Sequence, residues 1–196
     1  MPPLVAGIVL AAGASRRMGR FKLLLPWRGR PVLDHVLRAA RASRLDPRIL
    51  VLGHEAAAIR AALDLDGFTA LHNPDYLSGQ SSSMRVGLRA APAACTGVLF
   101  LLGDQPAITP AFIDSLITLH ERSPHHILVP TVGGRRTSPV LFPGALRGEL
   151  LAVTGDQGGR PLLEALPEMV QPVPVDDPAL LTDLDEPSDL DPAPHA

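Results

Sequence analysis

Short apolar runs alternate along the chain with longer segments in which apolar residues recur every three or four positions. Short runs rich in Val, Ile and Leu are typical of strands buried on both faces, and the longer segments of amphipathic helices. The alternation predicts a three-layer αβα, Rossmann-like fold, in which helices cover both faces of a mostly parallel sheet. The predicted strands are Val5–Leu10, Ile49–Leu52, Thr69–His72, Val98–Leu102, Ile127–Val129 and Pro139–Phe142, and the predicted helices are Pro31–Ser43, Glu55–Leu63, Ser82–Ala91 and Thr109–Arg122.

Local signals add detail to this α/β pattern. Thr109 can cap a helix whose next residue is Pro110, and Pro31 suits a first helical turn. Gly133 and Gly134 lie between two strand-like runs and predict an inserted β-hairpin. A chain of 196 residues that is 46% hydrophobic is expected to form one domain, residues 1–196. We expect its core at about residues 4–190, and a disordered tail at about 191–196.

The formal net charge of -2 argues against a nucleic-acid-binding protein, which would carry a strongly basic face. Acids are absent between Arg16 and Arg30, a stretch with six cations, and Lys and Arg are absent after Arg160, where nine acids follow. These regions could meet across a phosphate and metal site, or they could be two separately solvated surfaces.

One cysteine, Cys95, cannot form an internal disulfide and has no metal-ligand spacing around it, so we interpret it as structural and the protein as intracellular. No 18-residue apolar stretch or signal peptide is evident, which predicts a cytoplasmic protein without a membrane partner. We interpret Trp27 and Tyr76 as packing groups. We interpret six of the seven histidines as surface or helix-face residues: His35, His54, His72, His120, His125 and His126.

Lys22 is the only lysine beside 17 arginines, and it ends a loop of small residues that follows the first predicted strand. A compact ammonium and closely approaching backbone N–H groups suit a phosphate. The loop, residues 11–22, fits neither a Walker A motif nor the Gly-x-Gly-x-x-Gly fingerprint, which argues against a hydride-transfer enzyme. We expect Arg17 and Lys22 to neutralise a triphosphate. The alternative is chance in an arginine-rich chain.

Asp104 follows another buried strand directly, and a buried strand rarely delivers a carboxylate to its end for packing reasons. Hard divalent cations prefer carboxylate oxygen, so we interpret Asp104 as an Mg2+ ligand. Alternatively, Asp104 opens a turn with Pro106. Further acids at residues 183–186 could supply a second ligand, but their spacing does not show that they approach Asp104.

Two more loops are candidates for substrate binding. Asn73, Gln80, Ser81 and Ser82 belong to a polar loop that enters a helix and could bind a base or ribose, although serines at a helix start are often ordinary caps. The glycine-rich loop at residues 155–160 could close over an acceptor substrate or simply terminate a helix.

These motifs resemble the MobA-like nucleotidyltransferases, most closely the branch that transfers a cytidylyl group to molybdenum cofactor, whose fold is of the nucleotide-diphospho-sugar transferase type. The resemblance covers about residues 5–190. Its most specific motif is Leu10–Gly19 (LAAGASRRMG) with Lys22–Pro26 (KLLLP). The other motifs are Gly79–Met84 (GQSSSM), Gly103–Pro106 (GDQP), Pro139–Phe142 (PVLF) and Gly155–Arg160 (GDQGGR).

The resemblance implies roles for individual residues. Leu10, Ala11, Ala12 and Gly13 would contact the base and sugar, and Lys22 the phosphates. Asp104 would bind Mg2+, with Asp185, or else Asp183, as the second ligand. The double alanine before Gly13 resembles enzymes that use CTP rather than GTP. Relatives often carry His or Asn at position 138, where this chain has Ser138, a position expected to face the acceptor together with Asp156 and Arg160.

The implied reaction needs no protein nucleophile, because a phosphate oxygen of the acceptor attacks the α-phosphorus of the nucleotide and pyrophosphate leaves. Lys22, Arg17 and Asp104 would act through position and charge. Two other functions share these motifs. One is nucleotidyl transfer to a sugar phosphate or another phosphorylated metabolite, and the other is an accessory protein that passes nucleotide or finished cofactor to a molybdoenzyme.

Overall fold

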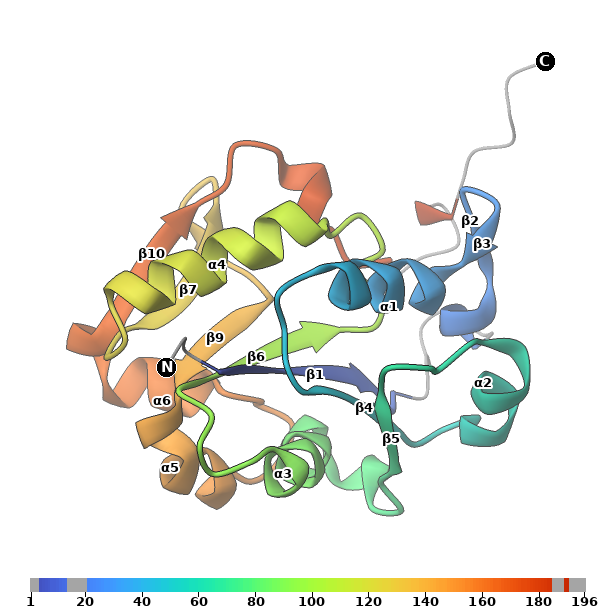
Figure 1. The fold of residues 1–196 in the computed structure, drawn as a ribbon, viewed down its shortest axis with the longest axis horizontal. Coiled ribbons are helices and arrows are strands. Elements are labelled where there is room, and N and C mark those ends of the chain that lie inside the picture. The colour runs from blue at the N-terminus through green and yellow to red at the C-terminus, as the bar shows by residue number, and fades with distance from the viewer. Residues whose placement is uncertain (1–3, 14–20, 185–188, 191–196) are drawn as a thin grey trace.

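The computed structural model describes residues 4–13, 21–184 and 189–190. Its centre is an eight-stranded sheet in the order β10-β7-β9-β6-β1-β4-β5, with β8 paired to β7 (Figure 1). The bounds of these strands are β1 Val5–Ala11, β4 Arg48–Leu52, β5 Thr69–His72, β6 Gly97–Leu102, β7 Ile127–Val132, β8 Arg135–Arg136, β9 Val140–Pro143 and β10 Val170–Pro174.

The sheet is mostly parallel, as the alternating pattern predicts. Strand β1 pairs in parallel with β4 and β6, and β10 pairs in parallel with β7, whereas β9 runs antiparallel to β6 and β7. The register aligns Leu10 with Leu102 and Ala11 with Leu52. The carboxyl ends of β1, β4 and β6 therefore meet at one edge, where ligands of such sheets bind.

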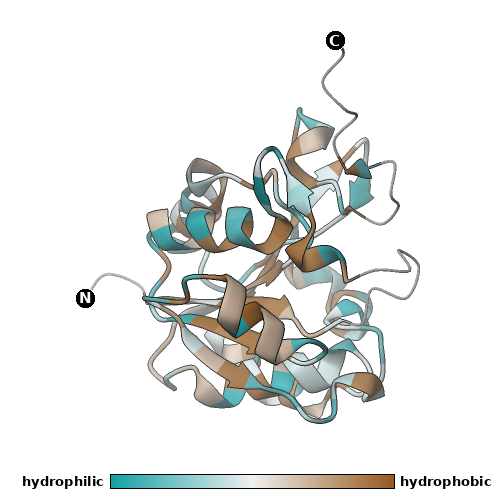
Figure 2. Cartoon of the chain, turned by 90° about the vertical axis from the view of Figure 1, so that its right-hand side faces the viewer, coloured by the Kyte–Doolittle hydropathy of each residue, from teal (hydrophilic) through white to brown (hydrophobic). Residues whose placement is uncertain are grey.

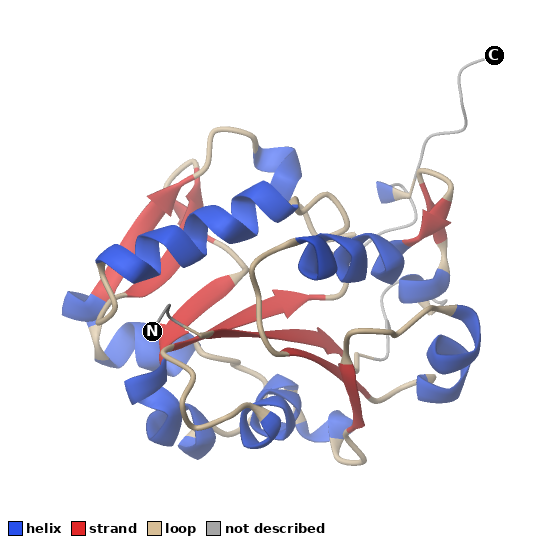
Figure 3. Cartoon of the chain, viewed as in Figure 1, coloured by secondary structure: helices blue, strands red, loops and turns tan. Residues whose placement is uncertain are grey.

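Helices cover both faces of the sheet (Figure 3). One buried cluster joins the sheet to α1 (Val32–Ala42), α2 (Ala56–Ala62) and α4 (Pro110–Arg122). The other joins it to α3 (Gln80–Ala90), α5 (Arg147–Ala152) and α6 (Arg160–Ala165). Figure 2 shows the hydrophobic colours gathered on the strands between these helices. The predicted αβα layering is confirmed.

Several local predictions are confirmed at the level of single contacts. The hydroxyl of Thr109 accepts a hydrogen bond of 3.2 Å from the Phe112 amide and caps α4. Gly133 and Gly134, with φ of +54° and +79°, turn β7 into β8. Pro31 lies one residue earlier than predicted, as the N-cap of α1.

The sequence pattern missed five helices and strands. Strand β10 contains Pro172 and Pro174, which argue against a strand, but it lies at the edge of the sheet, where a missing N–H donor is tolerated. Helices α5 and α6 have six residues each, too few to show helical periodicity. The two-residue strands β2 (Pro26–Trp27) and β3 (Arg30–Pro31) form a separate small hairpin.

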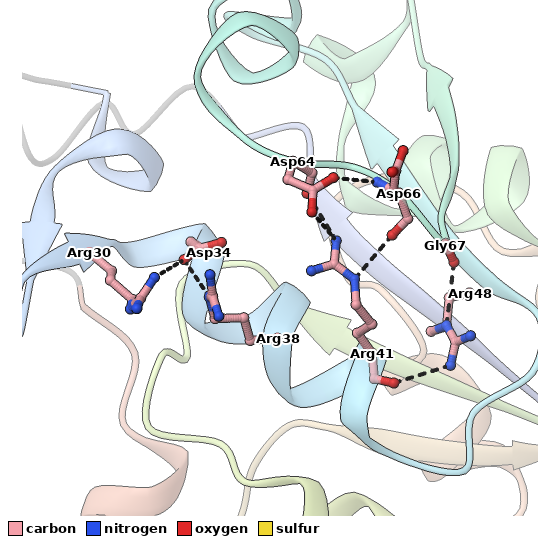
Figure 4. A network of polar contacts seen from close by, with 8 residues as sticks. All are labelled: Arg30, Asp34, Arg38, Arg41, Arg48, Asp64, Asp66 and Gly67. Carbon is pink, nitrogen blue, oxygen red and sulfur yellow. Dashed lines mark hydrogen bonds and ion pairs between the residues drawn. The ribbon is translucent and has the colours of Figure 1, made fainter.

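Arg41 of α1 and Arg48 of β4 hold the loop at residues 64–67 in place (Figure 4). Arg38 Nε lies 2.8 Å from Asp34 Oδ2, one turn away on α1. Arg41 donates to the carbonyls of Asp64 and Asp66 at 3.0 Å each, and Arg48 donates to that of Gly67 at 3.3 Å. Planar, multi-donor guanidinium groups suit this bridging of several carbonyls.

His120, interpreted from the sequence as a surface or helix-face residue, lies on the inner face of α4, where its side chain is fully buried. It lies on α4 under the first residue of β6, where a Cβ added to Gly97 would come within 2.8 Å of His120 Nε2. Neither ring nitrogen has a hydrogen-bond partner among the described residues. Burial lowers the pKa of His120, so the ring is neutral in the folded protein.

The free energy of unfolding is therefore expected to decrease as the pH falls below about 6.5, the ordinary pKa of histidine. In that range the unfolded chain binds a proton at His120 and the folded chain does not, until the pH reaches the lowered folded pKa. Urea unfolding of wild type and His120→Leu between pH 8 and 5 measures this effect. We expect a shallower pH slope for the variant, and parallel slopes would contradict a buried neutral ring.

No helix in the described segments is both long and apolar enough to cross a bilayer.

Candidate active site

Lys22 and Asp104 form an ion pair at the carboxyl edge of the sheet. Lys22 Nζ lies 2.6 Å from Asp104 Oδ2, and the two side chains are only 11% and 23% exposed. Lys22 begins the short helix η2 (Lys22–Leu24), and Asp104 lies two residues beyond β6. The single lysine and the acid at the end of a strand, 82 positions apart, thus meet as the sequence predicts.

The C-terminal segment reaches the same place. The amide of Leu184 donates a 3.0 Å hydrogen bond to the carbonyl of Asp104, and the amide of Gly103 donates one of 3.0 Å to that of Leu10. Residues 181–184, in the acidic C-terminal segment, therefore lie beside the loop that follows β6. Asp183 belongs to this segment, whereas Asp185 lies outside the described residues.

The donor groups at this edge fit a hard divalent cation. Carboxylate oxygens are the ligands that Mg2+ prefers, and it usually takes only one or two of them, completing its shell with water and substrate phosphates. The described residues contain no cluster of three or more His, Cys, Asp or Glu that could enclose a metal by themselves. Asp104, with Asp183 on the adjoining segment, could hold such an ion when it arrives with a triphosphate.

The first loop begins in a tightly packed corner. Ala11 and Ala12 are 1% and 5% exposed, and the carbonyl of Ala12 accepts a 3.2 Å hydrogen bond from the His54 amide. A Cβ added to Gly53 would lie 2.8 Å from that carbonyl. Gly13 is exposed, and a Cβ there would meet no atom within 4 Å. The chain therefore presents open backbone at Gly13. Arg17 lies outside the described residues.

In the polar loop before α3, residues 73–79, many polar groups form hydrogen bonds with one another or with the start of α3. Asn73, only 1% exposed, donates to the hydroxyls of Ser82 and Ser83 at 2.8 and 2.9 Å. Its Oδ1 accepts from the Asp75 amide at 3.0 Å. The Ser82 hydroxyl is also within 2.8 Å of the Gly79 carbonyl. The network holds residues 73–79 in one shape beside the ligand edge.

The glycine-rich loop docks on the start of α3. The Ser81 hydroxyl donates to the Gly155 carbonyl at 2.7 Å, and the Gln80 amide donates to Asp156 Oδ1 at 2.9 Å. Asp156 thereby caps a helix from a distant part of the chain, where a carboxylate is favoured. Gly79 permits this contact, because a Cβ there would lie 2.5 Å from the backbone of Gly155.

Gly79→Ala is expected to destabilise the protein by about 2 kcal/mol or more, because Ala at φ +107° is strained and would also collide with backbone. Gly134→Ala is the matched control, since Gly134 has φ +79° but no atom within 4 Å of an added Cβ. We expect about 1 kcal/mol for this backbone strain alone. Chemical denaturation compares the two variants, and equal losses would contradict the close contact between Gly79 and Gly155.

A cavity of about 370 Å³ lies near the ion pair, although neither Lys22 nor Asp104 is part of its lining. Leu10 and Leu102, at the carboxyl ends of β1 and β6, and Asp183 line its nearer part. Apolar side chains and polar side chains both line it. The apolar residues are Leu10, Met84, Phe100, Leu102, Val129, Val140, Phe142 and Leu163. The polar ones are Gln80, Arg136, Thr137, Ser138, Gln157, Arg160, Glu164 and Asp183. This composition, an apolar surface with a few polar groups, is typical of small-molecule sites.

The structure groups the predicted site residues into three sets. Leu10, Gln80, Ser138 and Arg160 line the cavity, and Lys22 and Asp104 form the nearby ion pair. Asn73, Ser81, Ser82 and Asp156 make the internal contacts described above. Sequence reasoning missed Arg136, although its place next to the Gly133-Gly134 turn was a usable signal. It also missed Gln105, which directly follows Asp104.

Comparison with known families matches residues 7–170 to the MobA-like NTP transferase domain. The chain belongs to the MobA-like NTP transferase family. That result confirms the resemblance seen in the motifs and agrees with the fold, the paired Lys22 and Asp104, and the nearby cavity.

Relatives in this family carry different names. Nicotine blue oxidoreductase of Paenarthrobacter nicotinovorans is 31% identical, over 93% of both chains. Purine catabolism protein PucB of Bacillus subtilis is 33% identical, over 83% of this chain and 82% of its own. Molybdenum cofactor cytidylyltransferase of Escherichia coli is 37% identical over 106 residues, 52% of each chain.

Solved structures agree over nearly the whole chain. Rv0371c of Mycobacterium tuberculosis H37Rv superposes with a TM-score of 0.84 at 33% identity, covering 96% of both chains. A second structure of Rv0371c, in complex with manganese, superposes with a TM-score of 0.80 at 32% identity, over the same share of both chains. A homologue of this chain has thus been observed with a divalent metal.

Proposed function

We propose that this protein is an Mg2+-dependent cytidylyltransferase that moves CMP from CTP onto the terminal phosphate of molybdenum cofactor and releases pyrophosphate. The observation that carries the proposal is the pairing of Lys22 with Asp104 at 2.6 Å near an open cavity. Phosphoryl and nucleotidyl transfer depend chiefly on position and charge neutralisation, and a lysine, a carboxylate and exposed loop backbone supply both.

In the proposed reaction an oxygen of the acceptor phosphate forms a bond to the α-phosphorus of CTP, and the bond from that phosphorus to the β-phosphate oxygen breaks. Lys22, Arg17 and backbone N–H groups of the loop would hold the departing pyrophosphate, while Leu10 to Gly13 would contact the base and sugar. Asp104, with Asp183 or Asp185, would hold the Mg2+ ion. When bound, Mg2+ would stabilise the negative charge that builds up on the phosphate oxygens.

The ion pair suggests how substrate binding is accommodated. Without nucleotide, the ammonium of Lys22 neutralises the Asp104 carboxylate, both being largely withdrawn from water. A metal-bound triphosphate carries both positive and negative charge. On its binding, the Asp104 carboxylate could bind the metal and the Lys22 ammonium could bind a phosphate. No buried charge would be left unpaired at either stage, which avoids the large cost of an isolated buried ion.

The cavity lining favours a heterocyclic acceptor over a sugar. Phe100 and Phe142, with ring centroids 6.0 Å apart, lie among aliphatic side chains in the lining. A polyhydroxylated sugar would need a hydrogen-bonding partner for most of its hydroxyls, whereas the flat pterin of molybdenum cofactor has large apolar faces. Ser138 and Arg160 at the same cavity would bind the polar groups of the acceptor.

Two further observations support CTP and molybdenum cofactor as the substrates. The Ala11-Ala12-Gly13 sequence resembles the cytidylyl-transferring branch, and a relative 37% identical over half the chain is named for transfer to this cofactor. We place the reaction in the cytoplasm, from which the product would pass to a molybdoenzyme.

The test measures pyrophosphate release by the purified protein with Mg2+ and CTP, in the presence and absence of reduced molybdenum cofactor. We expect release that requires the cofactor and is much faster with CTP than with GTP. Glucose 1-phosphate replaces the cofactor in a parallel reaction, and NADPH consumption is followed because one relative is named an oxidoreductase. Release with the sugar phosphate alone, or NADPH oxidation without pyrophosphate, would overturn the proposal.

A further inference from the structure

Gln105 is a buried polar residue next to Asp104. Its side chain is 1% exposed, and Nε2 donates hydrogen bonds to two backbone carbonyls, that of Leu181 at 3.0 Å and that of Ser138 at 3.4 Å. Its Oε1 is also buried and has no partner among the described residues. The amide group thus uses its donors and leaves its acceptor unsatisfied.

The two carbonyls belong to separate walls of the site. Ser138 lines the cavity at the end of the hairpin formed by β7 and β8. Leu181 ends the short helix η6 (Pro178–Leu181), and two residues later Asp183 lines the same cavity. Leu184 then donates to the carbonyl of Asp104. The Gln105 side chain and the Asp104 backbone therefore fasten residues 181–184 at two points, one of which also holds the hairpin.

The chemistry of the contact requires an amide. Two carbonyl oxygens need N–H donors, which a glutamine –NH2 group supplies and an ionised glutamate of the same length does not. A buried carbonyl without a partner is costly, so Oε1 opposes folding rather than favouring it. Gln105 has satisfied donors but an unsatisfied acceptor, so its contribution to overall stability is small. Its presence is better explained by the alignment of the two segments whose carbonyls it binds.

We propose that Gln105 is a positioning residue that holds residues 181–184 against the Ser138 wall, and thereby sets the acceptor relative to Asp104. The inference rests on the proposed function, because the acceptor site is part of that function. Gln105 does not touch the reacting atoms itself. Its removal should disturb the acceptor side of the site and leave the Lys22 side, where CTP would bind, unchanged.

The experiment compares wild type with Gln105→Met, which keeps the length of the side chain but has no N–H donor. Amide hydrogen exchange is measured at Leu184 in the absence of any substrate, and we expect it to be about tenfold faster in the variant, as for the loss of a hydrogen-bond anchor. In the pyrophosphate assay, KM for the acceptor should rise about tenfold, while calorimetric affinity for CTP should stay within about twofold.

His120→Leu is the matched control, since it replaces another buried polar residue at the opposite end of β6. It should leave both the exchange of Leu184 and the acceptor KM unchanged. If the Met variant does not fold, Gln105→Asn replaces it in both measurements. This variant keeps the N–H donors but shortens the side chain, so the same changes in Leu184 exchange and acceptor KM are expected. Wild-type exchange at Leu184 together with a wild-type acceptor KM, in a folded variant, would overturn the inference.

The exchange measurement separates this inference from the proposed function. Because it needs no substrate, it decides whether Gln105 anchors residues 181–184 even if the wild-type protein releases no pyrophosphate. Faster exchange combined with an inactive wild type would count against the proposed function alone. Unchanged exchange combined with an active wild type would count against the role of Gln105 alone.

Discussion

Asp104→Asn is expected to fold as the wild type does and to turn over at least about a hundredfold more slowly in the pyrophosphate assay. The substitution keeps the size and polarity of the side chain but removes the negative charge that would hold Mg2+. It leaves Lys22 without its carboxylate partner at 2.6 Å, so some loss of stability is also expected. The loss of turnover should persist at saturating CTP, because the missing interaction belongs to the transition state.

Asp34→Asn is the matched control for this prediction. Asp34 is also a largely buried carboxylate in an ion pair, with Arg38 at 2.8 Å, but it lies on α1 and not at the ligand edge. Its substitution should lower stability slightly and leave turnover within about twofold of wild type, as for an exposed or half-exposed pair. Near wild-type turnover by a folded Asp104→Asn protein would remove Asp104 from the metal site.

Lys22→Met is expected to have two opposite effects on binding. Affinity for CTP should fall by about tenfold or more, because an ammonium that contacts phosphate is lost. Affinity for Mn2+ alone should rise, because the Asp104 carboxylate no longer has the ammonium within 2.6 Å competing for it. Calorimetric titrations with CTP and, separately, with Mn2+ measure both. General damage to the fold would weaken both affinities together, so the opposite signs are diagnostic.

Lys22→Arg serves as the control for charge. It keeps the positive charge but replaces a compact point charge with a planar fork, which the chain uses elsewhere for bridging carbonyls. We expect partial recovery of CTP affinity and no gain in Mn2+ affinity. Unchanged CTP affinity in the Met variant would place the triphosphate away from Lys22.

Membership of the family establishes less about the reaction than the site does. Within this family, relatives of similar identity are named as an oxidoreductase, a purine catabolism protein and a cytidylyltransferase. One fold can serve different chemistry through residues at its ligand edge. The apolar lining around Phe100 and Phe142, the Lys22 and Asp104 pair and the loop backbone at Gly13 are therefore the features on which the proposed activity depends.

The sequence was sufficient to predict the elements whose pattern is local. Buried strands such as Val98–Leu102 are visible in the sequence as continuous apolar runs. Thr109 marks the start of its helix because its hydroxyl caps the amide of Phe112, only three residues further along the chain. These strand and helix predictions need no knowledge of packing. Lys22 and Asp104 meet because β1 and β6 are neighbouring parallel strands, and the segments that follow such strands share one edge of the sheet.

Other features depend on contacts between distant segments, and the sequence could not show them. The two prolines of β10 fit only because that strand lies at an edge, and His120 is buried only because Gly97 leaves room above its ring. Gln105 resembles an ordinary turn residue until its partners at Ser138 and Leu181 are known. Asp156 was predicted to bind the acceptor, but its carboxylate caps α3, a role that depends on how the 155–160 loop docks.

Anomalous scattering from Mn2+, in crystals grown with the metal and a non-hydrolysable CTP analogue, decides whether Lys22 and Asp104 hold one metal-bound nucleotide between them. We expect an anomalous peak at a metal ion bound to a carboxylate oxygen of Asp104, with the triphosphate of the same nucleotide in contact with the ammonium of Lys22. A metal and triphosphate bound elsewhere, with the ion pair between Lys22 and Asp104 still intact, would contradict this arrangement.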